Sequence, residues 1–432
     1  MNKNHCPKCN LHTKINYEYN SSDDIDDYYQ HALMSSLRAL SNKKEEKSDE
    51  KKPIDVRIDF IRNVLGNNKL EPMIDFDNCN TESLTNTRLK KRIMNVKDLF
   101  TSMNVKLRYL KSGTTGHTFK ATSKINEGVS FAVKVCAYPK DDYGTMNHPF
   151  RPENAELRML KLLSYFVVKK FTPHFVLPIG TFNTCITNFI RVPKNIINLD
   201  DEKNEMYKKF IERYYDGEFE SIVSVLISEW CNGGDLLDYI RKNHNKMLLK
   251  HWIVIIFQIL FTLALIHQKY PAFRHNDMKA NNILVQLTTT REEQSTSRYS
   301  YLMNKTRFVV PNINLQIKIW DFDFACIDGI IENNKVNADW TKKINITKKE
   351  NKYYDMHYFF NTLTSKRFFP QFYDGGAPRE IVEFVHRIIP EKFRMGSKNV
   401  NKKGRILVDT EFTTPYKTIL QDPLFKKYRF SY

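Results

Sequence analysis

The sequence lacks the marks of a secreted or membrane-spanning protein. Its 432 residues contain no uninterrupted run of eighteen apolar residues and begin with no basic segment followed by an apolar one, so we expect neither a transmembrane helix nor a secretory leader. The most apolar stretch, residues 251–268, is interrupted by Gln258 and Thr262 and is typical of a buried core helix. Only seven scattered cysteines occur, which indicates a reducing, intracellular compartment rather than a disulfide framework.

A complete zinc site is also missing from the sequence. Cys6 and Cys9 have the C-x-x-C spacing of zinc ligands, and His5 and His12 lie nearby. No second pair follows, and the two histidines could complete a set of four ligands only with strained geometry. Two interpretations stay open, zinc binding and an unstructured terminus, and we expect the second.

The positive charge is not gathered into one patch. A formal net charge of +18 would ordinarily point to nucleic acid or an anionic membrane as partner. The lysines are dispersed, however, and mixed with asparagine and acidic residues, as in residues 41–52, a composition typical of a solvated linker. Nucleic acid is therefore not indicated as a partner, and the charge suits docking of an acidic substrate or simple solubility.

Two polar motifs stand beside apolar runs of strand character. HNDMKANNILV spans residues 275–285, and IKIWDFDFA spans residues 317–325. Transfer of a γ-phosphoryl group from ATP to a hydroxyl needs Mg²⁺ on the phosphate oxygens and a carboxylate that orients the hydroxyl and accepts its proton. Asp277, Asn282 and Asp321 can supply these parts. The two motifs therefore predict a phosphoryl-transfer site.

The first motif resembles the catalytic loop of the protein kinase superfamily, H-R-D-x-K-x-x-N, and the second resembles its metal-binding D-F-G segment. The resemblance implies that Asp277 is the catalytic base and that Lys279 contacts the γ-phosphate. It also implies that Asn282 and Asp321 hold Mg²⁺, with Mn²⁺ as an alternative, and that ATP is the donor. The fold expected from the resemblance is α+β and bilobal. A small, mainly antiparallel β lobe with one key helix would stand on a large, mainly helical lobe.

A phosphate cradle and a lysine are expected upstream of these motifs. Residues 110–122 fit a glycine-rich loop between two strands, with Gly113 and Gly116 at the spacing of the second and third glycines. The first glycine is missing, and two glycines three apart also occur in ordinary hairpin turns. Lys134 follows on an apolar strand, where an ammonium group needs a partner. By resemblance, that partner is the α- and β-phosphates together with a helix glutamate.

The helix glutamate is predicted at Glu156. It is followed by an apolar stripe at residues 159–163, which marks one helical face as buried. Glu156 lies at the edge of that stripe and would point inward with it. Glu153, one turn earlier, is the alternative.

A strand, a connector and a helix start follow at residues 223–240 and look like a kinase hinge. Two glycines break the strand, and Asp235 is placed to cap the helix. By resemblance, Ser228 would guard the back of the nucleotide pocket, the backbone from Glu229 to Cys231 would bind adenine, and Asp235 would lie near the ribose.

The motifs divide the chain into an extension and a kinase domain of two lobes. Residues 1–98 lack catalytic signatures and are expected to form a partly disordered extension with some helical patches. Residues 99–232 would form the small lobe and hinge, and residues 233–432 the large lobe. Two insertions are expected, a charged one around residues 191–218 and one at residues 288–300 that is polar enough for an exposed hairpin tip.

Two departures from the kinase motifs bear on regulation, and one further aspartate bears on the shape of the catalytic loop. Asn276 stands where many kinases have an arginine that pairs with an activation-loop phosphate, so we expect that loop phosphorylation is not obligatory. Asp323 replaces the glycine of D-F-G and removes a permissive backbone position, so we expect a segment held in one state. Asp355 opens an apolar helical run and is predicted to brace the catalytic loop.

The D-F-D segment combined with YYDMHYFFNTL is similar to the late, virion-packaged serine/threonine kinases of poxviruses and other large DNA viruses. The resemblance covers about residues 99–425 and is strongest over residues 274–363. It implies phosphorylation of serine or threonine in protein substrates, virion or membrane-assembly proteins among them, in the host cytoplasm or the virion. Lys279, two residues after Asp277, favours serine and threonine over tyrosine.

Two other functions stay open. Small-molecule kinases of the choline and aminoglycoside type also use H-x-D-x-x-x-x-N and a D-x-D-like strand, although Lys279, the A-V-K strand and the G-G-D of the hinge argue against them. A pseudokinase scaffold is suggested by the missing glycine and by Asp323. The presence of all four polar site residues, Lys134, Asp277, Asn282 and Asp321, argues against a scaffold.

Overall fold

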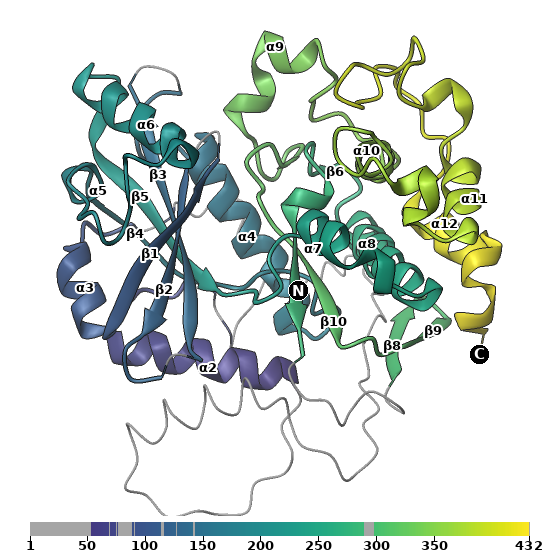
Figure 1. Ribbon diagram of the computed structural model, residues 1–432, viewed down its shortest axis with the longest axis horizontal. Helices are drawn as coiled ribbons and strands as arrows, with labels where there is room; N and C mark the ends of the chain where they lie inside the picture. The colour runs from purple at the N-terminus through teal and green to yellow at the C-terminus, as the bar shows by residue number, and fades with distance from the viewer. Residues whose placement is uncertain are drawn as a thin grey trace, which may run out of the picture.

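The chain folds into two lobes, one built on a β-sheet and the other mostly helical (Figure 1). This arrangement confirms the predicted α+β, bilobal architecture. Cys6, Cys9, the linker at residues 41–52 and most of the predicted hairpin tip lie outside the described residues. The computed structural model describes residues 53–68, 70–74, 76, 89, 91–113, 116–126, 128–140, 143–288 and 298–431.

The small lobe is an antiparallel sheet of five strands in the order β1-β2-β3-β5-β4. Its central strands, β3 and β5, carry the apolar runs of the sequence and are buried along most of their length. A strand that is apolar at successive positions needs cover on both faces, and here helices and the N-terminal segment supply it. The strands are β1 (Val105–Ser112), β2 (His117–Ser123), β3 (Ser130–Pro139), β4 (Pro178–Cys185) and β5 (Phe219–Glu229).

Helix α4 (Pro152–Val168) is the key helix of the small lobe. It begins with Pro152 in its first turn, where a missing amide hydrogen costs nothing. Nearly every side chain along its length is buried, including the acidic Glu153 and Glu156. Buried carboxylates require partners, and those partners define the site described below.

Part of the predicted extension belongs to the core of the small lobe. Helix α2 (Pro53–Asn68) buries Ile54 and Ile61, and the ring of Phe60 stacks on Phe131 of β3 with centroids 5.7 Å apart. Helix α3 (Val96–Ser102) precedes β1, and Lys91 donates hydrogen bonds to Tyr138, Asn154 and Ser224 at 2.7–2.9 Å. The division of the chain at residue 98 stays a prediction.

The first predicted insertion lies in the connection between β4 and β5. It contains α5 (Thr187–Ile190), the short η2 (Glu202–Asn204) and α6 (Glu205–Tyr215). Two rings of α6, Tyr207 and Phe210, pack against His117 at the start of β2, with centroids 4.7 and 4.3 Å apart. Burial lowers the pKa of His117 to about 4, so its ring is neutral there. The insertion thus covers the strand that follows the glycine-rich loop.

Helix α8 (Leu249–Lys269) is the central helix of the large lobe. It is apolar on all sides and buried from Trp252 to His267, as expected of a core helix. Among the described helices it alone is long and apolar enough to cross a membrane, and 83% of its most apolar window is buried inside the protein. The other helices of this lobe are α7 (Leu236–Asn243), α9 (Asp339–Lys342), α10 (Tyr354–Leu363), α11 (Arg379–Ile388) and α12 (Pro415–Gln421).

Short strands set the catalytic motifs side by side. β7 (Ile283–Leu287) pairs antiparallel with β10 (Leu315–Ile319), and Ile283 lies opposite Ile319. The residues just outside this ladder, Asn282 and Asp321, are therefore neighbours. The second insertion contains a hairpin of β8 (Arg298–Met303) and β9 (Thr306–Pro311), to which β12 (Arg429–Ser431) adds a third strand. The hairpin turns at residues 304–305, so the predicted tip is wrong at residues 298–300, which belong to β8. β6 (Phe273–Arg274) pairs with β11 (Cys326–Ile327).

Candidate active site

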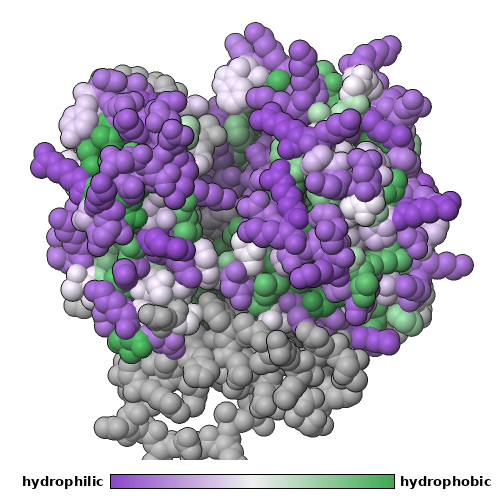
Figure 2. All heavy atoms as spheres, viewed as in Figure 1, coloured by the Kyte–Doolittle hydropathy of each residue, from purple (hydrophilic) through white to green (hydrophobic). Residues whose placement is uncertain are grey.

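A cavity of about 570 Å³ lies between the two lobes. Its walls come from the glycine-rich loop, β3 and the hinge on one side, and from the catalytic loop and metal segment on the other. The recess between the lobes is visible in Figure 2. Ten of the predicted site residues line it: Gly113, Gly116, Lys134, Glu229, Cys231, Asp235, Asp277, Lys279, Asn282 and Asp321. The remaining one, Glu156, lies directly behind Lys134.

Lys134 is held between two carboxylates. Its ammonium nitrogen lies 2.6 Å from Glu156 Oε1 and 3.1 Å from Asp321 Oδ1. Burial disfavours the charge of Lys134, but the two carboxylates outweigh burial and raise its pKa well above the ordinary lysine value. Burial would raise the pKa of Asp321, but Lys134 outweighs it and keeps this pKa below its ordinary value. Lys134 and Asp321 are therefore charged near neutral pH, whereas burial raises the pKa of Glu156 to about 7 despite the neighbouring Lys134, so that carboxyl group is only partly ionised there.

The local structure explains why these three side chains meet. Lys134 lies in the middle of β3, paired with Thr118 on one side and Leu226 on the other. Glu153, the alternative partner, instead accepts a hydrogen bond from Arg151 at 3.3 Å. Asp321 has a φ of 63°, a left-handed conformation that aspartate tolerates better than most residues.

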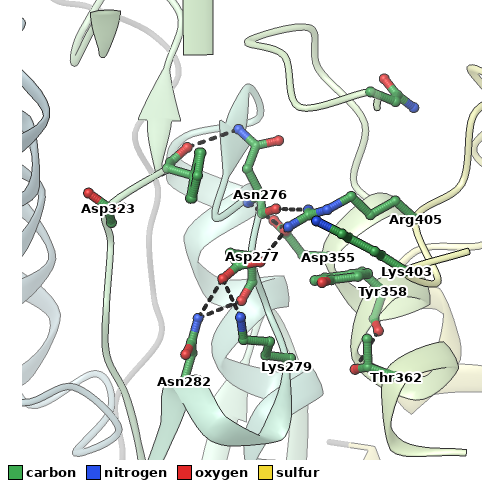
Figure 3. A network of polar contacts seen from close by, with 12 residues as sticks. Asn276, Asp277, Lys279, Asn282, Asp323, Asp355, Tyr358, Thr362, Lys403 and Arg405 are labelled. Carbon is green, nitrogen blue, oxygen red and sulfur yellow. Dashed lines mark hydrogen bonds and ion pairs between the residues drawn. The ribbon is translucent and has the colours of Figure 1, made fainter. Parts of the chain in front are cut away.

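Three side chains donate hydrogen bonds to Asp277 of the catalytic loop (Figure 3). Lys279 donates to Oδ2 at 2.7 Å, and the Asn282 amide donates to the same oxygen at 2.9 Å. Arg405, from a loop between α11 and α12, donates to Oδ1. Asp277 is thus fixed through both oxygens by a cation on each side.

Asp355 braces this loop from the start of α10, as predicted. Its carboxylate accepts hydrogen bonds from the backbone amides of His275 at 2.7 Å and Asn276 at 2.9 Å. Asn276 has a left-handed φ of 63°, and asparagine is among the residues that accept this conformation. The buried carboxylate therefore holds the loop in a bent shape just before Asp277.

The activation segment is the part of the chain between Asp321 and α10. It is held by one neutral side-chain amide and by a buried ion pair. The side-chain amide of Asn276 donates to the carbonyls of Phe324 at 3.1 Å and Thr347 at 3.0 Å. Asp323, the residue that replaces glycine, is buried and pairs with the buried Lys335. These contacts agree with the expectation that the segment is held in one state.

The carboxylate of Glu229 is buried at the hinge and is bound by Arg57 of α2. Arg57 Nε donates to Glu229 Oε2 at 3.0 Å, and Nη2 donates to Oε1. The same guanidinium donates to the carbonyls of Pro173 at 3.1 Å and Phe175 at 2.9 Å, in the connection between α4 and β4. Leu177 completes the set, because its amide donates to Glu229 Oε1 at 2.8 Å. A helix from the predicted extension thus fixes the hinge.

We expect Arg57→Ala to lower the free energy of unfolding by about 3–5 kcal/mol, since it leaves the buried Glu229 carboxylate without its cation. Arg62→Ala is the matched control. Arg62 lies on the same helix but is exposed, and its pair with Asp59 is long, at 4.0 Å. Its replacement should lower the free energy of unfolding by less than about 1 kcal/mol. Urea denaturation of both variants measures the difference. An equal loss of unfolding free energy in the two variants would show that the buried pair of Arg57 and Glu229 stabilises the fold no more than an exposed pair does.

The hinge backbone and the glycine-rich loop close the cavity. The Glu229 amide donates to the Leu177 carbonyl at 3.1 Å, and the Glu229 carbonyl accepts from Ser228 Oγ at 3.5 Å. Asp235 caps α7 by accepting from the Asp238 amide at 3.0 Å, and its other oxygen lies 3.6 Å from Lys111, which occupies the position of the missing glycine. A side chain at Gly116 would meet Cys136 Sγ at 2.7 Å, so the loop requires glycine there.

Sequence reasoning missed Arg57, Arg405 and Lys335. Arg57 lies 172 residues from Glu229, and Arg405 lies 128 residues from Asp277. No motif or spacing links residues so far apart, and arginine is common in this basic chain. Lys335 could have been suspected, because the buried aspartate introduced at position 323 needs a cation, but several lysines follow it.

The side chains of this cavity suit Mg²⁺. Asn282 and Asp321 offer amide and carboxylate oxygens, which are the ligands this ion prefers. Among the described residues, no group of three or more His, Cys, Asp or Glu is placed to hold a metal alone. A site with few protein ligands is typical of magnesium, which retains water and phosphate oxygens.

Comparisons with known proteins agree with this geometry. A family model described as "Protein tyrosine and serine/threonine kinase" matches residues 205–346. The "Putative serine/threonine-protein kinase R400" of Acanthamoeba polyphaga mimivirus is 65% identical over 411 residues, which are 95% of this chain and 88% of that protein. A second protein of this virus, "Putative serine/threonine-protein kinase R301", is 36% identical over 80 residues, which are 18% of this chain and 20% of that protein. The likeness to poxvirus kinases stays a prediction, since both relatives come from a mimivirus.

Proposed function

The chain belongs to the protein kinase family, as a serine/threonine kinase, and from this premise we propose that it transfers the γ-phosphoryl group of ATP, with Mg²⁺, to seryl and threonyl hydroxyls of proteins. The observation that carries the proposal is the convergence of Lys134, Asp277, Asn282 and Asp321 on one cavity. A cavity of about 570 Å³ is in the range of small-molecule and cofactor sites.

Each side chain has a proposed task in the transfer. Lys134, held by Glu156 at 2.6 Å, binds the α- and β-phosphates. Asn282 and Asp321 would hold Mg²⁺, which when bound would neutralise charge on the phosphate oxygens. Lys279 lies 2.7 Å from Asp277 Oδ2 and lines the same cavity, where it would contact the γ-phosphate.

Asp277 is the proposed base. The acceptor oxygen forms a bond to the γ-phosphorus while the bond from that phosphorus to its bridging oxygen breaks, and ADP leaves. The hydroxyl proton passes to the Asp277 carboxylate. Adenine would bind the Glu229 carbonyl and the Cys231 amide, with Asp235 near the ribose, because these groups line the hinge side of the cavity.

Incubation with γ-labelled ATP and Mg²⁺ tests this proposal. Parallel reactions contain an acidic protein, a basic protein, choline and an aminoglycoside as acceptors. Label on seryl or threonyl groups supports the proposal. Label on a small molecule would favour a small-molecule kinase instead, and ATP binding without any transfer would favour a pseudokinase scaffold.

We expect the kinase to keep its activity after treatment with a phosphatase. The Asn276 amide, which carries no charge, ties the activation segment to the catalytic loop at 3.0–3.1 Å. An amide gains nothing comparable to the arginine–phosphate pair that orders phosphorylated loops. The measurement compares kcat before and after treatment, with intact mass confirming phosphate removal. A fall of about tenfold or more would mean that phosphorylation is required.

The identity of the protein substrates rests on resemblance alone. Virion and membrane-assembly proteins are the proposed substrates, and the host cytoplasm or the virion is the proposed location. Mass spectrometry of purified particles tests the location, because a packaged kinase would be found inside the particle after external proteins are digested away.

A further inference from the structure

Arg405 contacts the proposed catalytic base from a part of the chain without any kinase motif. Its guanidinium donates to Asp277 Oδ1 and, through Nη1, to the carbonyl of Asn276. Nη1 also lies 3.1 Å from the Tyr354 hydroxyl, and the guanidinium carbon lies 4.1 Å from the centre of the Tyr358 ring. With a residue exposure of 5%, Arg405 is a buried group and not a surface charge.

The loop that carries Arg405 is held rigidly. Asn401 Oδ1 accepts from the amides of Lys403 at 2.9 Å and Arg405 at 3.0 Å, which closes a tight turn. Asn361 of α10 donates to the Gly404 carbonyl at 3.2 Å, and Asn345 of the activation segment donates to the Ile406 carbonyl at 2.9 Å. The loop is therefore fixed to both elements that flank the catalytic loop.

The two oxygens of Asp277 have different surroundings. Oδ2 is bound by Lys279 and Asn282, and both of these side chains line the cavity. Under the proposed function, Lys279 and Asn282 would bind the γ-phosphate and the metal ion, and Oδ2 would then be the oxygen left for the acceptor hydroxyl. Oδ1 is bound by Arg405, which does not line the cavity, so a ligand in the cavity does not need to displace this contact.

We propose that Arg405 is a positioning residue, which anchors Asp277 Oδ1 so that Oδ2 faces the acceptor hydroxyl. This inference rests on the proposed function. Arg405 does not line the cavity, so it would act through Asp277. Figure 3 shows the arrangement, with Lys279 and Asn282 on one side of Asp277 and Arg405 on the other. A carboxylate that could rotate would lose the orientation on which proton transfer depends.

The test compares Arg405→Ala with the unaltered protein. We expect kcat to fall by about 10²-fold, the scale of a misplaced reacting group, while the KM for ATP stays within about twofold. Addition of guanidinium at tens of millimolar should fill the vacated space and restore at least tenfold of the lost kcat. If Arg405 had only a structural role, its replacement would lower thermal stability. It would not lower kcat selectively at an unchanged KM for ATP, and guanidinium would not restore kcat.

Arg387→Ala is the matched control. Arg387 makes a bidentate pair with Asp422 at 2.8 and 2.9 Å in the same lobe, away from the cavity. We expect its kcat to stay unchanged and guanidinium to have no effect on it. This control separates loss of the Asp277 contact from general loss of a paired arginine.

Arg405→Lys keeps the inference testable if the alanine variant does not fold. Lysine retains the positive charge but cannot bridge Asp277, Asn276 and Tyr354 together. We expect a folded protein with reduced kcat and an unchanged KM for ATP. Unaltered kcat in either variant would overturn the positioning role, and so would a fall in kcat of Arg405→Ala that guanidinium does not rescue. Absence of transfer by the unaltered protein would instead overturn the proposed function.

Discussion

Asp277→Asn is expected to reduce kcat for protein phosphorylation by about 10²–10⁴-fold, the usual contribution of a general base. The amide has nearly the same shape as the carboxylate and can still accept a hydrogen bond from Arg405, so the fold should be kept. It cannot accept the hydroxyl proton. ATP affinity should be retained, because the variant leaves Lys134 and Asp321 in place.

Two measurements belong together for this variant. Steady-state phosphorylation gives kcat, and calorimetric titration with ATP and Mg²⁺ gives the affinity. Asp238→Asn is the control, because Asp238 lines the same cavity but is exposed and pairs with Arg241 at 3.7 Å. Transfer by Asp277→Asn at the rate of the unaltered protein would remove Asp277 from the mechanism.

Asp321→Asn is expected to lower kcat by about 10³-fold, because a metal ion supplies several kcal/mol of transition-state stabilisation. The amide is a weaker magnesium ligand and also leaves Lys134 with Glu156 as its only carboxylate partner among the contacts of the described site. The concentration of Mg²⁺ needed for half-maximal rate should therefore rise.

A magnesium titration of activity provides the readout. Asp328→Asn is the control in the same segment, since Asp328 is exposed and pairs with Lys348 at 2.8 Å outside the cavity. Its magnesium dependence should match that of the unaltered protein. An unchanged dependence in Asp321→Asn would mean that the metal is held elsewhere.

The sequence was sufficient for those parts of the site that are encoded in short motifs. The catalytic loop and the metal segment each flank an apolar strand, and pairing of the two strands sets Asn282 beside Asp321. Glu156 could be placed because the stripe at residues 159–163 fixed the buried face of its helix. In each case, local periodicity determined the direction of the side chain.

The contacts that support the site could not be predicted in this way. Arg57 and Arg405 reach their carboxylates from 172 and 128 residues away, so no local pattern records the pairing. The packing of α6 on His117 depends on how the insertion folds back over the sheet, and its composition indicated only that an insertion exists.

The N-terminal region shows the same limit. The absence of motifs in residues 1–98 suggested a separate extension, yet α2 lies in the small-lobe core and binds the hinge through Arg57. Helical patches were expected in this region from the sequence. The sequence did not show what the apolar face of α2 would cover, because that depends on the shape of the completed sheet.

A crystal structure with a non-hydrolysable ATP analogue and Mn²⁺ tests most directly whether nucleotide and metal meet between the lobes. We expect an anomalous difference peak about 2.1 Å from oxygens of both Asn282 and Asp321, with the Lys134 ammonium within hydrogen-bond distance of the α- or β-phosphate. A nucleotide bound outside this cavity, or a metal peak in contact with neither residue, would contradict the account.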